Sequence, residues 1–430
     1  MKKLLCLILA VCFWVSLIIT NSYAGEIDIL LQKLVEKGVL TGAEAQQIKV
    51  ETKEAVKKEI VAGKSETLPA WVQAIKIKGD FRGRYQYNHG KSTATSTTER
   101  HRARIRLRLG VEGKVNDKLK VGVGLATGLN STESSSTLSA DYARSTNQTL
   151  YEGFSKKGIG LDYAYAEYAF SPWGNFIGGK FKNPLWEPGD LIWDTDINPE
   201  GAALNLNKKL MLGGLGLNVF STTGVFPLDE SSSSGDDPMM YVQQAGLTHN
   251  LTDTISLKTA LAYMYTSTQG DTLDGTTSTN TTPLEDFSML TPAVELKFKE
   301  PFKFLGVGFL NIPSLTLFGE YVKNTHAPND KKDTGFMTGL KFGAEKIEGW
   351  GDWQASYNFA ALQKDAILDI LPDSDRYGGQ TGVRAHEAKF SYGLGKNTWF
   401  DLDIYRAQRW RAGVARAPET VFQADWNMKF

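Results

Sequence analysis

Hydrophobic and polar residues alternate along most of the chain after residue 70. In the segment RHRARIRLRLG, arginine stands at every even position from Arg100 to Arg108, with residues such as Ile105 and Leu107 between them. A period of two places successive side chains on opposite faces of a β-strand. Segments of about ten residues or more are long for a soluble strand and suit a tilted membrane-spanning one. The pattern predicts about sixteen strands, at residues 71–87, 100–112, 119–125, 161–171, 174–182, 200–208, 213–224, 239–251, 254–267, 285–299, 313–324, 334–346, 350–363, 382–395, 398–409 and 419–430.

The links between these strands alternate in length. Short links such as 172–173 and 396–397 alternate with long polar ones such as 128–160 and 225–238. Tight turns on one rim and extended loops on the other are typical of outer-membrane barrels. The sequence therefore predicts an all-β protein, a transmembrane antiparallel β-barrel of about sixteen strands with a short N-terminal α-helical segment.

The last strand supports closure of the barrel. In VFQADWNMKF, apolar residues such as Trp426 alternate with polar residues such as Asp425, and the chain ends on Phe430. A soluble edge strand of this composition would be an aggregation hazard, whereas in a barrel it pairs with the first strand.

Residues 26–62 follow a helical period instead. Apolar residues from Ile27 to Val35 recur at helical spacing up to Gly38, and Thr41 with Glu44 forms a capping box that opens a second helix. The second helix has a thin apolar stripe, so it either needs a partner or is a marginal helical spacer. We expect residues 25–68 to form a periplasmic helical segment with its linker, and residues 69–430 to form the barrel.

The first 24 residues resemble a secretory signal. Lys2 and Lys3 precede an apolar run, and Ser22-Tyr23-Ala24 supplies the small residues that signal peptidase requires. The alternative is an uncleaved anchor, because the run is long enough to cross a bilayer. Both cysteines lie in this segment, so cleavage after Ala24 leaves a mature chain without disulfides.

Charge and motifs exclude several functions. The 48 basic residues balance the 48 acidic ones, which argues against a general nucleic-acid partner. The five histidines are scattered, and no HExxH, GxSxG, Walker A or dinucleotide motif is present. We expect no catalytic residues, no cofactor and no metal site; the acids near Asp190 lack a calcium-loop pattern.

Three segments carry a resemblance to a known family. LLQKLVEKGVLTGAEAQ, GGKFKNPLWEPGDLIWDTDINPEGAAL and the terminal aromatic residue look like those of the putative porin family of Gram-negative outer membranes, and GKFKNP is also similar to the phosphate-selective porins. The resemblance implies a passive, water-filled channel in the outer membrane, of about sixteen strands and assembled as a homotrimer, with membrane lipid around it and small hydrophilic solutes as its cargo.

In such a barrel the arginines must face the lumen. Each arginine on the lipid side would cost ~2–4 kcal/mol near the midplane. The candidate pore-lining residues are Arg82, Arg84, Arg100, Arg102, Arg104, Arg106 and Arg108. They either form an anion-attracting wall or are neutralised by acids across the pore.

The loop 183–200, NPLWEPGDLIWDTDINPE, is the candidate constriction. An external loop with this much apolar surface should fold inward. Its acids opposite the arginines would create a transverse field that orients polar solutes. The alternative is a surface loop that packs on a neighbouring subunit. The candidate residues are Trp186, Glu187, Asp190, Trp193, Asp194 and Asp196.

Three functions remain open at this point. The first is a porin for small hydrophilic solutes or ions, favouring anions through the arginines. The second is a barrel enzyme, for which no nucleophile–base pattern is found. The third is a structural or adhesive barrel that residues 26–62 tether to the cell wall.

Overall fold

The computed structural model describes residues 31–51 (except 32, 39, 43 and 49), 75–91, 97–128, 141–151, 153–213, 215–230, 237–267, 280, 286–303, 312–327, 332–410 and 416–430. The chain divides into two compact units, Met1–Gln73 and Ala74–Phe430. The predicted signal segment and residues 52–68 of the predicted helical segment and linker lie outside the described residues.

The N-terminal unit has helical residues at 33–36 and 44–48. Gly38 follows the first of these at a φ of +69°, a value that glycine adopts without strain. The capping box is confirmed: the Thr41 backbone N–H donates to Glu44 Oε2 at 2.8 Å, and the Glu44 N–H donates to Thr41 Oγ1 at 3.3 Å. Among the described residues, no helix combines the length and apolar character needed to cross a bilayer.

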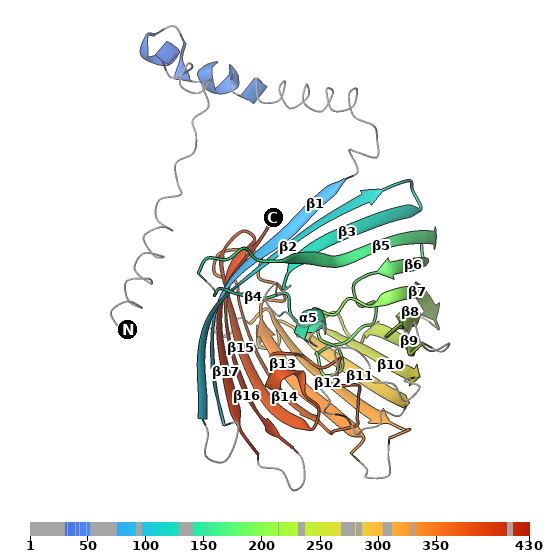
Figure 1. Cartoon of the computed structure of the whole chain (residues 1–430). Coiled ribbons are helices and arrows are strands. Elements are labelled where there is room, and N and C mark those ends of the chain that lie inside the picture. Colours follow the sequence, from blue (N-terminus) through green and yellow to red (C-terminus); the bar gives the residue numbers. More distant parts are fainter. Residues whose placement is uncertain are drawn as a thin grey trace. The chain divides into compact units, whose positions relative to one another are not determined.

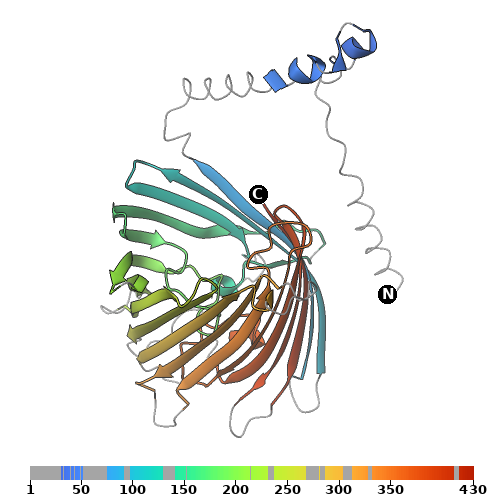
Figure 2. The same ribbon diagram turned by 180° about the vertical axis from the view of Figure 1, so that it is seen from behind.

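The larger unit is a closed antiparallel barrel (Figure 1). Each of its sixteen long strands pairs with its neighbours, and the ring closes because β1 pairs with both β2 and β17. Figure 2 shows the same ring from behind. The strands are β1 (Lys76–Lys91), β2 (Thr97–Lys114), β3 (Leu119–Thr127), β5 (Ile159–Ser171), β6 (Gly174–Lys180), β7 (Glu200–Leu212), β8 (Leu215–Pro227), β9 (Met239–Asn250), β10 (Ile255–Ser267), β11 (Phe287–Lys299), β12 (Ser314–Asn324), β13 (Thr334–Gly343), β14 (Trp353–Leu362), β15 (Val383–Gly395), β16 (Thr398–Arg409) and β17 (Glu419–Lys429).

The predicted barrel of about sixteen strands is confirmed, with two differences. The first strand spans Lys76–Lys91 and so ends later than the predicted 71–87, while residues 71–74 of the prediction lie outside the described residues. A further short strand, β4 (Gln148–Thr149), pairs with Ile105 and Arg104 of β2, where β3 has already ended. Two residues are too few to show a period in the sequence.

Apolar side chains cover the outside of the barrel. On β2, Leu107 and Leu109 are 38% and 41% exposed, while Arg106 next to Leu107 is 7% exposed. The same alternation continues around the ring, with Val123, Leu317 and Trp426 among the exposed apolar residues. An apolar outer surface is what a barrel in lipid requires.

A second apolar cluster lies inside the barrel. Inward residues of β8 to β14, among them Met264, Phe318 and Met337, pack against the loop after β6 and the loop after β14. The short helix α5 (Asp141–Arg144) also lies within the ring of strands in both views (Figures 1 and 2). One side of the interior is therefore filled.

Candidate pore and its constriction

The pairing of β1 with β2 gathers the predicted arginines on the inner face of the barrel. Arg82 stands directly opposite Arg106, and Arg84 directly opposite Arg104. Arg108 stands opposite Asp80, nearer the periplasmic end. The seven arginines thus form a column across two neighbouring strands, which we call the arginine ladder: Arg82, Arg84, Arg100, Arg102, Arg104, Arg106 and Arg108.

Carboxylates bind the middle of the ladder. Arg84 forms a two-pronged ion pair with Asp425 of β17, with Nε–Oδ1 and Nη2–Oδ2 distances of 2.8 Å. Arg82 lies 3.3 Å from the same carboxylate. These side chains are largely buried, so each charge depends on its partner.

Asp80 has the same role at the next level toward the periplasm. It bonds to Arg106 at 2.8 Å and to Arg108 at 2.8 Å. Two successive ladder positions on β2 therefore share one strand carboxylate. Asp80 and Asp425 are not among the site residues predicted from the sequence, although both stand at inward-facing positions of β1 and β17.

The outer part of the ladder contacts neutral oxygens. Arg104 donates to Gln86 Oε1 at 3.0 Å and to the carbonyl of Asn147 at 3.0 Å. Arg102 donates to Asn88 Oδ1 at 3.1 Å. Arg100 is exposed at the outer end of the column, opposite Asn88.

The loop 181–199 folds into the barrel, as its apolar residues predict. Leu191, Ile192 and Trp193 are 1%, 3% and 4% exposed. Glu320 of β12 accepts hydrogen bonds from the backbone N–H groups of Gly189 (2.8 Å) and Leu191 (3.2 Å). A buried carboxylate that accepts two backbone donors fixes the bend of the loop.

The wall and the loop are also joined at Trp186. Its backbone N–H donates to Gln244 Oε1 at 2.8 Å, and its carbonyl accepts from Gln244 Nε2 at 3.0 Å. Its ring lies 4.4 Å from the ammonium of Lys258. Trp186 and the buried Trp193 therefore anchor the two ends of the bend.

The prediction for the acids of this loop was wrong in part. The sequence predicts that they oppose the arginine ladder, and Asp196 does so, 3.3 Å from Arg108. Asp190 instead pairs with Arg376 of a second inward loop at 2.7 Å. Asp194 accepts the backbone N–H groups of Asp196 and Ser374 at 2.8 and 2.9 Å, so it also ties the loops together.

Burial changes the protonation of two of these acids. It raises the pKa of Asp194 to about 8, helped by the neighbouring carboxylate of Asp196. Burial also raises the pKa of Glu187 well above its usual value, and the carboxylates of Glu320 and Asp190 act in the same direction. Both side chains therefore favour the protonated form, which carries no charge toward a solute.

The second inward loop, 363–382 between β14 and β15, departs from the sequence pattern, which predicts a long polar external loop. Its residues Ala366, Ile367 and Leu368 are fully buried. Asp375 in this loop lies 3.1 Å from Nη1 of Arg84. Burial would raise the pKa of Asp375, but the charges of Arg84 and Arg104 outweigh it and lower the pKa, so this carboxylate is ionised. The apolar run AILDIL is the signal that sequence reasoning overlooked.

A third segment joins the two loops. The guanidinium of Arg144, at the end of α5, is 1% exposed and donates from Nη1 to the carbonyls of Asp369 (3.0 Å), Pro372 (3.3 Å) and Gly379 (2.9 Å). The Arg144 carbonyl accepts from Ser374 Oγ at 2.9 Å. Segment 141–149 and the two loops thus form one braced partition inside the barrel.

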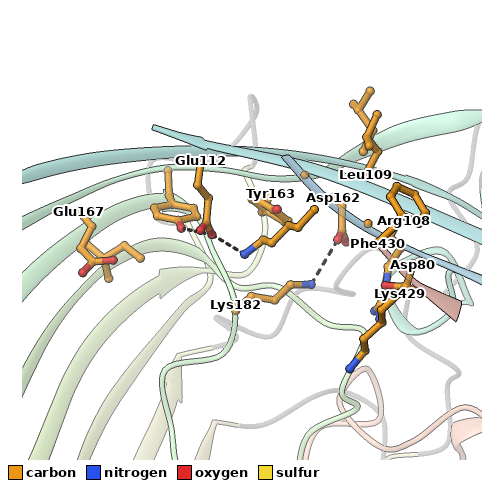
Figure 3. Close-up of a pocket in the computed structure, with 16 residues that line it drawn as sticks. Asp80, Arg108, Leu109, Glu112, Asp162, Tyr163, Glu167, Lys182, Lys429 and Phe430 are labelled. Atoms are coloured by element: carbon orange, nitrogen blue, oxygen red, sulfur yellow. Dashed lines mark hydrogen bonds and ion pairs between the residues drawn. The ribbon is translucent and has the colours of Figure 1, made fainter. Parts of the chain in front are cut away.

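Two cavities flank the middle of the ladder. The outer cavity, of about 190 Å³, is lined by Arg102, Arg104, Asp375 and Glu419 among others. The inner cavity, of about 520 Å³, extends from Arg108 toward the C-terminal Phe430. Figure 3 shows its charged wall, where Lys182 reaches Asp162 at 3.2 Å. Arg82, Arg84 and Arg106 lie between the two cavities along the ladder and line neither of them.

The acids of the partition are not arranged as a metal site. Among the described residues, no three His, Cys, Asp or Glu side chains gather in a way that could hold a metal ion. The partition acids contact guanidinium and backbone N–H groups instead.

A closed barrel with a charged, partly filled lumen defines the class of outer-membrane channels. The sequence profile of the family described as Putative porin matches residues 88–300 and 315–430, so the chain belongs to that family. A search of curated proteins found no match.

Solved porin structures resemble the fold. The high-pH structure of OprB from Pseudomonas putida aligns with a TM-score of 0.54 at 12% identity, covering 84% of this chain and 95% of OprB. An anion-selective porin from Comamonas acidovorans aligns with a TM-score of 0.47 at 12% identity, covering 83% and 99%. At this identity, the OprB match supports the barrel fold, and the family membership supports an outer-membrane channel for solute diffusion.

Proposed function

We propose that the protein is a diffusion porin that favours small anions, with the arginine ladder as its selectivity wall. The observation that carries this proposal is the charge balance along the ladder. Seven arginines face five carboxylates on this side of the lumen: Asp80, Asp196, Asp375 and Asp425 bond to ladder arginines, and Glu419 lines the outer cavity with Arg102 and Arg104. The bonded carboxylates hold the guanidinium groups in place and reduce their charge without cancelling it. The resulting selectivity is moderate.

The path of the solute follows the charged side of the lumen. The partition and the apolar inner faces of β8 to β14 fill the opposite side. An anion entering from outside meets Arg100, Arg102 and Arg104, passes the level of Arg84, and reaches the inner cavity beside Arg108. Guanidinium keeps its charge at any physiological pH and offers planar contacts to carboxylate or phosphate.

Planar-bilayer recording tests this proposal. The zero-current potential in a KCl gradient should show an anion preference, which falls in Arg104→Gln and rises in Asp375→Asn. The matched control is the double variant Arg84→Gln/Asp425→Asn, which removes one charge of each sign and should leave the preference near the wild-type value. Equal preferences in Arg104→Gln, Asp375→Asn and the wild type would refute the ladder as the selectivity wall.

A structural or adhesive role for the N-terminal unit is the second candidate. Met1–Gln73 is a separate compact unit, and its capping box belongs to a formed helix rather than to a strand of the barrel. Deletion of residues 26–62 should leave conductance unchanged and weaken retention of the barrel by purified cell wall. A deletion that abolishes barrel assembly would assign the unit to folding instead. Assembly as a homotrimer, which the family resemblance implies, can be measured by light scattering in detergent.

A further inference from the structure

The outward face of β15 and β16 carries a row of basic side chains near the outer rim. Val383, Ala385 and Ala407 are 3%, 1% and 2% exposed and face the interior. The residues that alternate with them, Arg384, His386 and Arg406, therefore face the membrane, and His386 and Arg406 are exposed. His386 stands directly opposite Arg406 in the strand pairing, and Arg384 is its diagonal neighbour. We call these three residues the rim cluster.

The rim cluster lies at the outer edge of the lipid-facing band. β16 starts at Thr398, directly after a short turn, and Arg406 comes eight residues later. At about 3.3 Å per residue and a tilt of about 40°, Arg406 lies roughly 20 Å above the periplasmic end of the strand. The apolar band of such barrels is about 25 Å tall. The side chains can therefore reach the headgroups of the outer leaflet.

Aromatic and hydroxyl groups hold the rim cluster in position. His386 Nδ1 lies 2.6 Å from the hydroxyl of Tyr357 in a hydrogen bond, and its ring centroid is 4.8 Å from that of Phe359. Arg406 Nη1 donates to Thr420 Oγ1 at 2.6 Å. These contacts orient the basic groups without neutralising them.

The arginines of the rim cluster differ from Lys180 and Lys323, two outward lysines near the same rim, in their partners. Lys180 pairs with Glu200, and Lys323 pairs with Asp333. Within the described residues, no carboxylate lies within 4 Å of Arg384 or Arg406, and Arg384 Nε is buried without a hydrogen-bond partner. The sequence at 411–415, which follows β16, reads RAGVA and contains no acid.

We propose that the rim cluster binds the phosphate group of a lipid in the outer leaflet. Two guanidinium groups on adjacent strands, with an imidazole beside them, match the charge and the acceptor geometry of a phosphate. A phosphorylated lipid headgroup is the anion available at that depth in a bilayer. This inference rests on the outer-membrane location that the proposed function requires, and it identifies a lipid site outside the pore.

Lipid titration of the purified full-length protein in detergent tests the rim cluster. The probe is bisphosphorylated lipid A, compared with the same lipid after removal of its phosphates and with inorganic phosphate alone, and binding is followed by native mass spectrometry. The wild type should bind lipid A at least about tenfold more tightly than Arg384→Gln/Arg406→Gln, since each arginine near a charged surface contributes to binding. The matched control is Lys208→Gln, at the periplasmic end of β7, which should bind like the wild type.

Three results would overturn the proposal: equal lipid A binding by the wild type and the double variant, equal binding of the dephosphorylated lipid, or full competition by inorganic phosphate at lipid-equivalent concentration. Heat-modifiable mobility in gels confirms that the double variant is folded. Bilayer conductance of the same variant should match the wild type, because both arginines face away from the lumen. A wild-type protein that forms no conducting channels would refute the porin proposal and leave the lipid-binding result unaffected.

Discussion

The replacement Arg144→Met should release the second inward loop from the pore. The methionine keeps a long apolar stem but removes the guanidinium that donates to the carbonyls of Asp369, Pro372 and Gly379. Arg144 is 1% exposed, so water can replace the lost hydrogen-bond donor only if the partition opens. Asp375, which the loop carries to Arg84, should leave the ladder with it.

The free energy at stake follows from these contacts. A hydrogen bond to a charged group contributes about 1.5–3 kcal/mol, and buried carbonyls left without a donor add to the cost. A net loss of about 3 kcal/mol lowers the ratio of docked to undocked loop by roughly 150-fold, since every 1.4 kcal/mol is tenfold. The strand pairings that close the barrel do not involve Arg144, so the barrel itself should stay folded.

Single-channel recording distinguishes release of the loop from damage to the barrel. Arg144→Met should show a larger conductance and frequent transitions between levels, and Arg144→Lys, which retains the charge but not the fork of donors, should be intermediate. Because the anion preference should rise through the loss of Asp375, the double variant Arg144→Met/Asp375→Asn should have no higher preference than Asp375→Asn alone. A folded Arg144→Met channel with wild-type conductance and quiet open levels would refute the role of Arg144 in holding the loop.

Three further predictions concern the ladder and the partition. Asp425→Asn should lower stability by about 3–5 kcal/mol, because it leaves the buried Arg84 without its two-pronged partner, and the urea midpoint of unfolding measures it. The pKa of Asp194 is raised to about 8, so the protonated carboxyl stabilises the folded protein. This contribution is complete below about pH 4 and is lost as the pH rises through about 8. Channel noise should therefore increase as the pH rises from about 5 to about 8 in the wild type and change less in Asp194→Asn; equal slopes would contradict this. Gly379→Ala should reproduce the Arg144→Met conductance, because the new Cβ would overlap Arg144 Nη1 and the backbone φ is +71°; a wild-type channel would show that the loop can shift to accommodate it.

The strands of the barrel could be predicted because lipid imposes a strict rule on each of them. The alternation around Ile105 and Leu107 reports directly which side faces the bilayer, and the strand ends follow from the turn residues. The inward fold of 183–200 was predictable for the same reason, since Leu191, Ile192 and Trp193 cannot remain in water on an external loop.

The partners of the ladder could not be predicted in the same way. Asp425 meets Arg84 only because the last strand closes on the first, with residues 341 positions apart in the sequence. Asp375 reaches the same arginine through a loop whose direction depends on Arg144. Such pairings depend on strand register and loop docking, which a period of two does not specify. The apolar run at 366–371 did carry a local signal and resembles that of the first loop.

The zero-current potential of the purified wild-type channel in a roughly tenfold KCl gradient tests the central claim most directly. The seven-arginine ladder predicts a potential of the sign that chloride permeation produces, which moves toward zero in Arg102→Gln/Arg104→Gln. A potential of the opposite sign, or one that this double variant leaves unchanged, would contradict the account.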